Sequence, residues 1–127
     1  MPIAKRVVLY VEDDPVNVML MQGIVDLNEG CELHVARSGA EARNVVAGRP
    51  VDLVLCDRRL PDVEGDALLA ELRAGGLAAT VPALLVTAES EYVAADLSRR
   101  GGFDGFWCKP LDVMATLRSL QHWLATR

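Results

Sequence analysis

Short apolar runs rich in β-branched residues recur along the chain and restrict its fold more than any other feature. Each run is four to six residues long, which is the length of a buried strand. Runs of this kind predict strands that are covered on both faces. They are "VVLYV" (7–11), "ELHVA" (32–36), "VDLVLC" (51–56), "ALLVT" (83–87) and "GFWC" (105–108).

Helical patterns separate these runs. A first helix is predicted to begin at Pro15, whose missing N–H costs nothing in a first turn, and to reach Leu27 before Gly30 ends it. Ser38 and Glu41 form an S-x-x-E capping box that predicts the start of a second helix. Apolar spacing and glycine residues predict that the second helix ends near residue 48. They also predict helices over 65–74, 90–100 and 112–126.

Strands that alternate with helices predict an α/β fold with a doubly wound parallel sheet. The chain of 127 residues is expected to form one domain, 1–127, with a core that needs no disulfide or structural metal. In such sheets, ligands bind beyond the carboxyl ends of the strands, where the strand order reverses. The residues that end each strand are therefore the first candidates for a functional site.

Composition excludes several classes of function. The net charge of −5 argues against direct nucleic-acid binding and against an anionic membrane surface. No apolar stretch is long enough for a transmembrane helix, and the N-terminus does not resemble a signal peptide, so a cytoplasmic location is expected. The three cysteines lack C-x-x-C spacing and are predicted to be reduced thiols, with no zinc site.

Carboxylates follow two strands that would lie side by side. Glu12, Asp13 and Asp14 come after the first strand, and Asp57 comes after the third. Two carboxylates about 4 Å apart repel by roughly 4 kcal/mol at the effective dielectric of a protein surface, so something must offset the repulsion. Oxygen ligands without histidine or thiolate suit Mg²⁺, for which Mn²⁺ can substitute.

A hydroxyl and an ammonium group stand at two further strand ends, at Thr87 and Lys109. Because only two of the thirteen basic residues are lysines, Lys109 indicates that a compact point charge is needed there. The alternative is a lysine that extends from the strand end into solvent. The Lys109-Pro110 bond is a candidate for the cis form. Asp57 also has a plain alternative, which is to cap the turn after its strand.

This combination resembles the receiver domain of two-component response regulators, and the resemblance covers essentially the whole chain. It implies a flavodoxin-like sheet of five parallel strands in the order 2-1-3-4-5, flanked by five helices. The matching motifs are Glu12-Asp13 after the first strand, the D-x-x-L-P-x-x-x-G segment from Asp57 to Gly65, Thr87-Ala88 after the fourth strand, and Lys109-Pro110 after the fifth.

The resemblance also implies a role for each site residue. Asp57 would accept a phosphoryl group from a sensor histidine kinase or a histidine phosphotransfer protein. Asp13, Asp57 and the main-chain carbonyl of Arg59 would bind Mg²⁺ directly, and Glu12 would act through a water molecule. Such a domain is a regulatory phosphoacceptor and has no conventional catalytic turnover.

Switching is implied by the same resemblance. Thr87 and Lys109 would each contact a phosphoryl oxygen, Thr87 would move toward the group, and Phe106 would turn inward, unless Phe106 is plain core. The fourth helix, fifth strand and fifth helix would then present a changed surface to an effector protein or to a second copy in a homodimer. Candidate contacts on that surface are Tyr92, Arg99 and Trp107.

Three charged side chains near the site have no implied role. Asp14 is predicted to be the N-cap of the first helix ahead of Pro15, with an extra acid of the ion site as the alternative. Arg59 and Glu89 are either two solvated charges or an ion pair across the opening of the site, where the pair would slow the attack of water on a phosphorylated Asp57.

Other classes fit the sequence less well. A phosphatase of the haloacid dehalogenase type needs an acid two residues after its nucleophile, where Arg59 stands. A nucleotide binder of similar layout needs a glycine-rich or hydroxyl-rich loop after the first strand, and no GxxxxGK[ST] motif is present. A receiver-like interaction module that works without phosphorylation remains the alternative, and the complete set of five polar strand-end residues argues against it.

Overall fold

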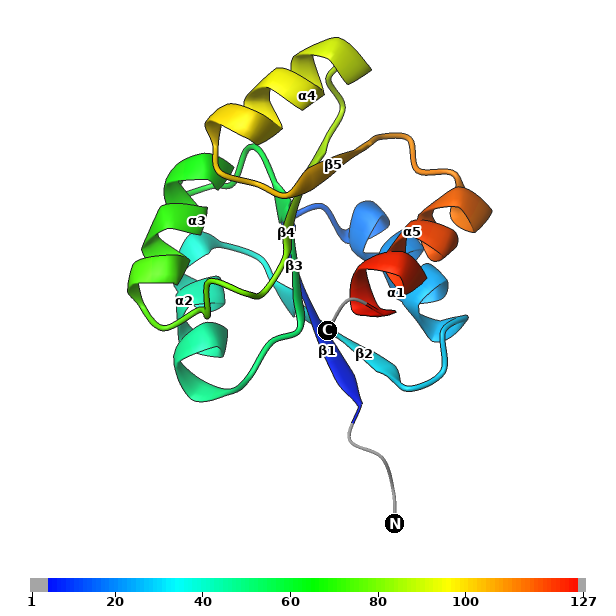
Figure 1. Ribbon diagram of the computed structural model, residues 1–127, viewed down its shortest axis with the longest axis horizontal. Coiled ribbons are helices and arrows are strands. Elements are labelled where there is room, and N and C mark those ends of the chain that lie inside the picture. The colour runs from blue at the N-terminus through cyan, green and yellow to red at the C-terminus, as the bar shows by residue number, and fades with distance from the viewer. Residues whose placement is uncertain (1–4, 126–127) are drawn as a thin grey trace.

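Five parallel strands form one sheet in the order β2-β1-β3-β4-β5 in the computed structural model, which describes residues 5–125 (Figure 1). The predicted fold class and strand order are therefore confirmed. In β1 and β3, the register pairs Val11 with Cys56, so that the two strands end side by side. The strands are β1 (Arg6–Val11), β2 (Cys31–Ala36), β3 (Leu53–Asp57), β4 (Ala83–Thr87) and β5 (Gly105–Cys108).

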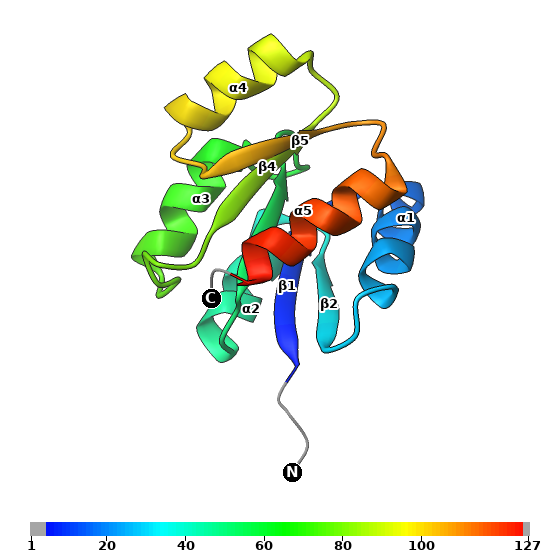
Figure 2. The same cartoon turned by 45° about the vertical axis from the view of Figure 1, so that its right-hand side comes forward.

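Helices cover both faces of the sheet (Figures 1 and 2). One face carries α1 (Pro15–Asp26) and α5 (Val113–Ala125), and the other carries α2 (Gly39–Gly48), α3 (Gly65–Ala74) and α4 (Glu91–Arg100). Side chains of β1 alternate between two hydrophobic clusters, because successive residues of a strand point to opposite faces. Leu9 packs on the α2–α3 side, and Val8 and Tyr10 pack on the α1–α5 side.

Side-chain caps fix the beginnings of four helices, and in α5 the Asp112 carboxylate accepts from the Ala115 N–H at 2.8 Å. The Asp14 carboxylate accepts a hydrogen bond from the Val16 N–H at 2.9 Å, which confirms Asp14 as the N-cap of α1. Ser38 and Ser90 cap α2 and α4 in the same way. The third strand lies at 53–57, slightly later than the predicted 51–56, and the predicted helix end at Thr126 lies outside the described residues.

The cysteines are free thiols. Cys31 and Cys56 are buried and Cys108 is partly buried. Burial raises the pKa of Cys31 to about 11, so this thiol stays protonated at neutral pH. Among residues 5–125, no helix has the length and the apolar character that crossing a membrane requires.

Candidate functional site

Three carboxylates meet at the carboxyl end of the sheet. Glu12 and Asp13 follow β1, and Asp57 is the last residue of β3, so the pairing of these strands brings the acids together. One oxygen of each carboxylate lies within 4.8 Å of the others. Glu12 is buried, Asp57 is half-buried and Asp13 is exposed, which leaves the cluster open on one side.

Lys109 follows β5 and extends its ammonium group into this cluster. Its Nζ atom lies 2.7 Å from Glu12 Oε1 and 3.5 Å from Asp57 Oδ1. Burial by itself raises the pKa of Glu12, but the hydrogen bond and charge of Lys109, together with the hydrogen bonds from the Asp14 N–H and the Tyr10 hydroxyl, hold this pKa below its ordinary value. The peptide bond between Lys109 and Pro110 is cis, as the sequence suggested.

Asp57 is the acid with the raised pKa. Burial and then the negative charge of Glu12 raise the pKa of Asp57 from its ordinary value of 3.8 to about 6, although Lys109 acts in the opposite direction. An acid whose ionised form is disfavoured gains most from a nearby cation. A carboxylate of this kind is suited to bind a metal ion or to act as a nucleophile.

Tyr10 belongs to the cluster and was missed by the sequence reasoning. Its side chain is fully buried in β1, and its hydroxyl donates to Glu12 Oε1 at 3.1 Å. Burial, followed by the charge of Glu12, raises the pKa of the Tyr10 hydroxyl, so the group remains a donor. Residues two apart in a strand share a face, and the Tyr10–Glu12 spacing is the signal that could have identified it.

Thr87 ends β4 beside the acids and is buried. Its hydroxyl oxygen accepts a hydrogen bond from the Glu89 N–H at 3.3 Å. A depression at this place is lined by Asp57, Arg58, Arg59, Thr87, Ala88, Glu89 and Lys109. The structure therefore brings the five predicted strand-end residues to one edge of the sheet.

Arg58 pairs with Glu89 across this depression, at 3.1 Å between Nη1 and Oε1. Of the two alternatives for Arg59 and Glu89, the ion pair between them is not formed, because Glu89 pairs with Arg58 and the Arg59 side chain is exposed. Arg58 was missed, because the sequence offers two adjacent arginines and does not indicate which of them pairs with Glu89.

The loop after Asp57 is held by its own backbone and by α2. The Gly65 N–H donates to the Arg58 carbonyl at 2.7 Å, and a Cβ on Gly65 would lie 2.5 Å from the Asp57 carbonyl oxygen. Asp62 in the same loop accepts from the Gly39 N–H at 2.8 Å, at the start of α2. These contacts fix the position of Asp57 and of the Arg59 main chain.

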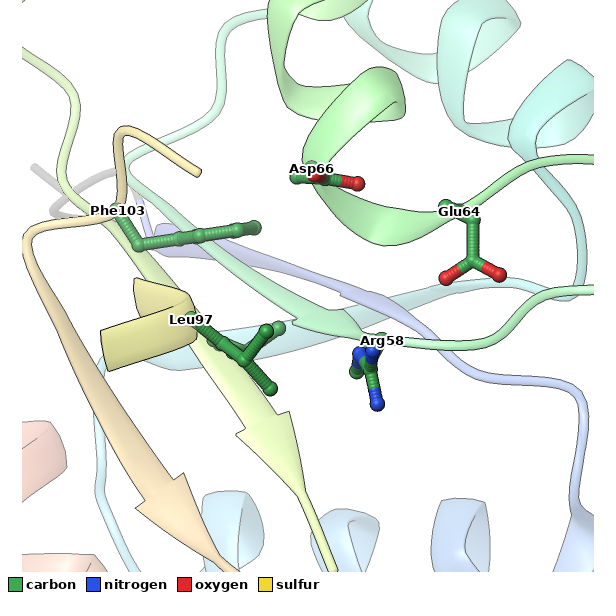
Figure 3. Close-up of a pocket in the computed structure, with 6 residues that line it drawn as sticks. Arg58, Glu64, Asp66, Leu97 and Phe103 are labelled. Carbon is green, nitrogen blue, oxygen red and sulfur yellow. The ribbon is translucent and has the colours of Figure 1, made fainter. Parts of the chain in front are cut away.

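A second cavity adjoins the site on the other side of Arg58. Leu97 and Phe103 extend toward it from one side, and Glu64 and Asp66 lie near the start of α3 on the other (Figure 3). Arg58 lines both this cavity and the depression at Asp57. The Arg58 side chain therefore belongs to the walls of both spaces.

The two aromatic residues of β5 face opposite sides of the sheet. Phe106 is half-buried and packs on the side of α3 and α4. Trp107 is 9% exposed and packs on the α5 side, where its Nε1–H donates to Ser119 at 2.8 Å. Trp107, a candidate contact, is therefore largely buried, although it lines a groove beside α5, whereas Tyr92 on α4 is 87% exposed.

The donor set of the cluster fits a hard divalent cation. Three carboxylates supply oxygen, and the Arg59 carbonyl lies in the same loop as Asp57. Within residues 5–125, no other group of three or more histidine, cysteine or acidic side chains is arranged to hold a metal ion. Mg²⁺ prefers oxygen ligands and uses few carboxylates, so it fits better than zinc.

Comparison with known proteins agrees with this geometry. The family model of the response regulator receiver domain matches residues 8–121. The chain is 35% identical to the TorCAD operon transcriptional regulatory protein TorR of Escherichia coli O157:H7, over 84% of this chain and 44% of that protein. It is 34% identical to the transcriptional regulatory protein ZraR of the same organism, over 91% of this chain and 26% of that protein. The chain thus spans less than half the length of these relatives.

Solved structures show the same fold. The receiver domain of sensor histidine kinase PA1611 from Pseudomonas aeruginosa, which has a magnesium ion in its active site cleft, superimposes with a TM-score of 0.83. It is 26% identical, over 96% of this chain and 99% of that chain. A putative response regulator from Chloroflexus aurantiacus superimposes with a TM-score of 0.86 at 26% identity, over 95% of this chain and 98% of that chain.

Proposed function

Because this chain belongs to the response regulator receiver domain family, we propose that it accepts a phosphoryl group on Asp57 in a two-component signalling pathway. The domain is a regulatory phosphoacceptor and not a conventional enzyme. The observation that carries the proposal is the placement of Asp57 with Glu12 and Asp13 within 4.8 Å and with the Lys109 ammonium 3.5 Å away. The residues from 1 to 127 would act as one receiver domain.

The proposed reaction follows from these positions. An Asp57 carboxylate oxygen attacks the phosphorus of a phosphohistidine, the new O–P bond forms, and the P–N bond breaks with its electrons going to the imidazole nitrogen. Asp13, Asp57 and the Arg59 carbonyl would hold Mg²⁺ directly, and Glu12 would hold it through a water molecule. The ion would supply positive charge that offsets the negative charge of the carboxylates and of the phosphoryl group. Transfer of this kind depends on positioning and electrostatic stabilisation.

The chain's own groups would hold the transferred phosphoryl group. The Lys109 ammonium, 3.5 Å from Asp57, is close enough to pair with one phosphoryl oxygen after a small movement. The Thr87 hydroxyl at the same strand edge would donate to another. As Thr87 moves, Phe106 on the neighbouring strand would turn inward, and this change at β5 would be the switch.

Receiver domains are partners of histidine kinases, and helix α1 is the face that we assign to this partner. Val16 and Met19 are 70% and 73% exposed, and the helix begins directly after the acids of the site. A helical bundle that carries a phosphohistidine, in a kinase or a phosphotransfer protein, would cover these side chains while its histidine reaches Asp57. The proposed location is cytoplasmic.

The α4-β5-α5 face is proposed to bind the effector or a second copy of the chain. A groove there is lined by residues of β5, of α5 and of the loop between them, among them Phe106, Leu111 and Ala115, and Tyr92 of α4 lies exposed. This groove includes part of Phe106, so an inward turn of its ring would change the groove directly.

The direct test is intact mass after incubation with Mg²⁺ and acetyl phosphate. One added phosphoryl group is expected in the wild type and in Asp26→Asn, which alters an exposed acid at the far end of α1. None is expected in Asp57→Asn or with EDTA. If no adduct forms, and beryllofluoride with Mg²⁺ leaves the fluorescence of Trp107 and Trp123 unchanged, the proposal fails in favour of an interaction module that needs no phosphorylation.

A further inference from the structure

Tyr10 places a polar group inside the core at the back of the acid cluster. The side chain is 0% exposed, and its ring packs in the cluster between the sheet and helices α1 and α5. A buried phenol needs a hydrogen-bond partner, and here the hydroxyl donates to Glu12 Oε1 at 3.1 Å. Phenylalanine would fill the same space without this bond, so packing alone does not explain why residue 10 carries a hydroxyl group.

The bonds of Glu12 indicate that reason. Oε1 accepts from both the Tyr10 hydroxyl at 3.1 Å and the Lys109 ammonium at 2.7 Å, and a carboxylate oxygen has two lone pairs. Oε2 accepts only a longer bond within the described residues, at 3.3 Å from the Asp14 N–H. The two donors on Oε1 therefore fix the rotation of the carboxylate and leave Oε2 with free acceptor capacity toward an ion.

The Lys109 ammonium would bind two different groups, first Glu12 and then the phosphoryl group on Asp57. In the resting structure, it lies closer to Glu12 than to Asp57, at 2.7 Å against 3.5 Å. In the proposed function, it must pair with a phosphoryl oxygen on Asp57 and therefore loosen its bond to Glu12. Glu12 is 1% exposed, so bulk water does not reach it to replace a lost donor. A buried carboxylate left without donors is strongly destabilised.

We propose that Tyr10 is a positioning residue, whose hydroxyl holds Glu12 oriented toward the ion and keeps it hydrogen-bonded while Lys109 transfers to the phosphoryl group. The orientation of Glu12 requires only the ion site, whereas the Lys109 step rests on the proposed function. Without the hydroxyl, Glu12 would depend on Lys109 alone at Oε1 and would hold it back from Asp57.

The test compares Tyr10→Phe with Tyr92→Phe, because the chain has two tyrosines and Tyr92 is exposed on α4. We would measure the Mg²⁺ dissociation constant, the beryllofluoride dissociation constant at saturating Mg²⁺, and the free energy of unfolding in EDTA. In Tyr10→Phe, we expect Mg²⁺ to bind about 2- to 5-fold more weakly and beryllofluoride about 5- to 30-fold more weakly, since one buried bond to a charged group is lost. Tyr92→Phe, which lies away from the ion site, should match the wild type in the Mg²⁺ dissociation constant and in the free energy of unfolding.

A purely structural Tyr10 would give a different result. Tyr10→Phe would then change the unfolding free energy in EDTA and leave both dissociation constants unchanged, which overturns the proposal. If the wild type binds Mg²⁺ but neither beryllofluoride nor a phosphoryl group, the proposed function fails and so does the Lys109 step, whereas the Mg²⁺ constants still decide whether Tyr10 orients Glu12.

A second measurement uses the wild-type chain and does not depend on the folding of a variant. Incorporation of 3-fluorotyrosine gives two ¹⁹F resonances, one for each tyrosine. Mg²⁺ alone should shift the Tyr10 resonance and leave the Tyr92 resonance in place, and beryllofluoride should shift Tyr10 again. A Tyr10 resonance that does not respond to Mg²⁺ overturns the proposal.

Discussion

The Arg58 guanidinium lies 3.1 Å from the Glu89 carboxylate, so an ion pair joins the loop after β3 to the loop after β4. These loops carry Asp57 and Thr87, and both members of the pair line the depression at Asp57. Both side chains are about one-third exposed, at 31% and 38%, so the pair contributes little to the stability of the fold. Because both side chains line the depression at Asp57, we expect the pair to limit the access of water to a phosphorylated Asp57.

Removal of this pair should shorten the lifetime of the phosphorylated protein. In Arg58→Ala and Glu89→Ala, we expect spontaneous dephosphorylation to be about two- to five-fold faster, because an ion pair of this exposure corresponds to at most about 1 kcal/mol. Loss of the adduct would be followed by intact mass after removal of the phosphodonor. The charge-swapped double variant Arg58→Glu/Glu89→Arg should recover part of the lifetime.

The matched control is Arg43→Ala, which removes an exposed Arg–Glu pair to Glu71 that joins α2 to α3 away from the site. Its dephosphorylation rate should equal that of the wild type. Equal rates in Arg58→Ala and Arg43→Ala would show that the Arg58–Glu89 pair does not limit access to Asp57.

Mg²⁺ should stabilise the fold through the carboxylate cluster. A ligand that binds only the native state at one hundred times its dissociation constant raises the free energy of unfolding by about 2.7 kcal/mol. We expect this gain in urea titrations of the wild type, and most of it should be lost in Asp13→Asn. Asp26→Asn should retain it. An equal gain in Asp13→Asn would place the ion elsewhere.

Without Mg²⁺, Asp57 should reduce stability at neutral pH. Its pKa is raised from 3.8 to about 6 on folding, so its neutral form is favoured in the native state. The resulting stability is fully present below pH 3.8 and is lost as the pH rises through about 6. In EDTA at pH 7.5, Asp57→Asn should therefore be more stable than the wild type by about 1–3 kcal/mol. The gain should be smaller at pH 5, and urea titrations at the two pH values measure it.

A gain that is the same at pH 5 and pH 7.5 would assign the effect to packing and not to ionisation. A less stable variant at pH 7.5 would show that the attraction of Lys109 outweighs burial and the charge of Glu12.

Gly65→Ala should damage both the fold and the ion site. Its Cβ would lie 2.5 Å from the Asp57 carbonyl oxygen, so the loop must shift at a cost of about 1–3 kcal/mol. The Mg²⁺ dissociation constant should rise as well, because the shift moves Asp57. Gly23→Ala in α1 is the control, since a Cβ there meets nothing within 4 Å and the change should stabilise the helix by up to about 1 kcal/mol. If both variants keep the wild-type Mg²⁺ affinity, Gly65 does not fix the site.

The fold and most of the site could be predicted because they depend on periodicity and on strand ends. Five apolar runs gave rise to the sheet, and a parallel sheet gathers the residues after its strands at one edge, which brought Asp57 and Lys109 together from distant parts of the chain. The roles of Arg58 and Tyr10 depend on the directions in which their side chains point, and a sequence motif does not indicate these directions. Arg58 and Arg59 are the same residue type at adjacent positions, and only the path of the loop decides which one reaches Glu89.

The burial of Trp107 has a related cause. Trp107 was a candidate contact on the α4-β5-α5 face, but α5 covers one face of β5, and most of the Trp107 side chain lies beneath it. Alternation along the strand places Phe106 on the opposite face. The sequence predicted that both faces of this strand are covered, but it did not indicate which of the two aromatic residues lies under α5.

Helix α1 contains no basic residue, and its one acidic residue, Asp26, lies at the end away from the site. Docking of a kinase on this helix would thus gain little from charge attraction and would draw on contact with Val16 and Met19. Such an association should show a negative heat-capacity change and little dependence on ionic strength. Discrimination between parallel signalling pathways in one cell would then rest on the shape of the partner's helices and not on long-range steering.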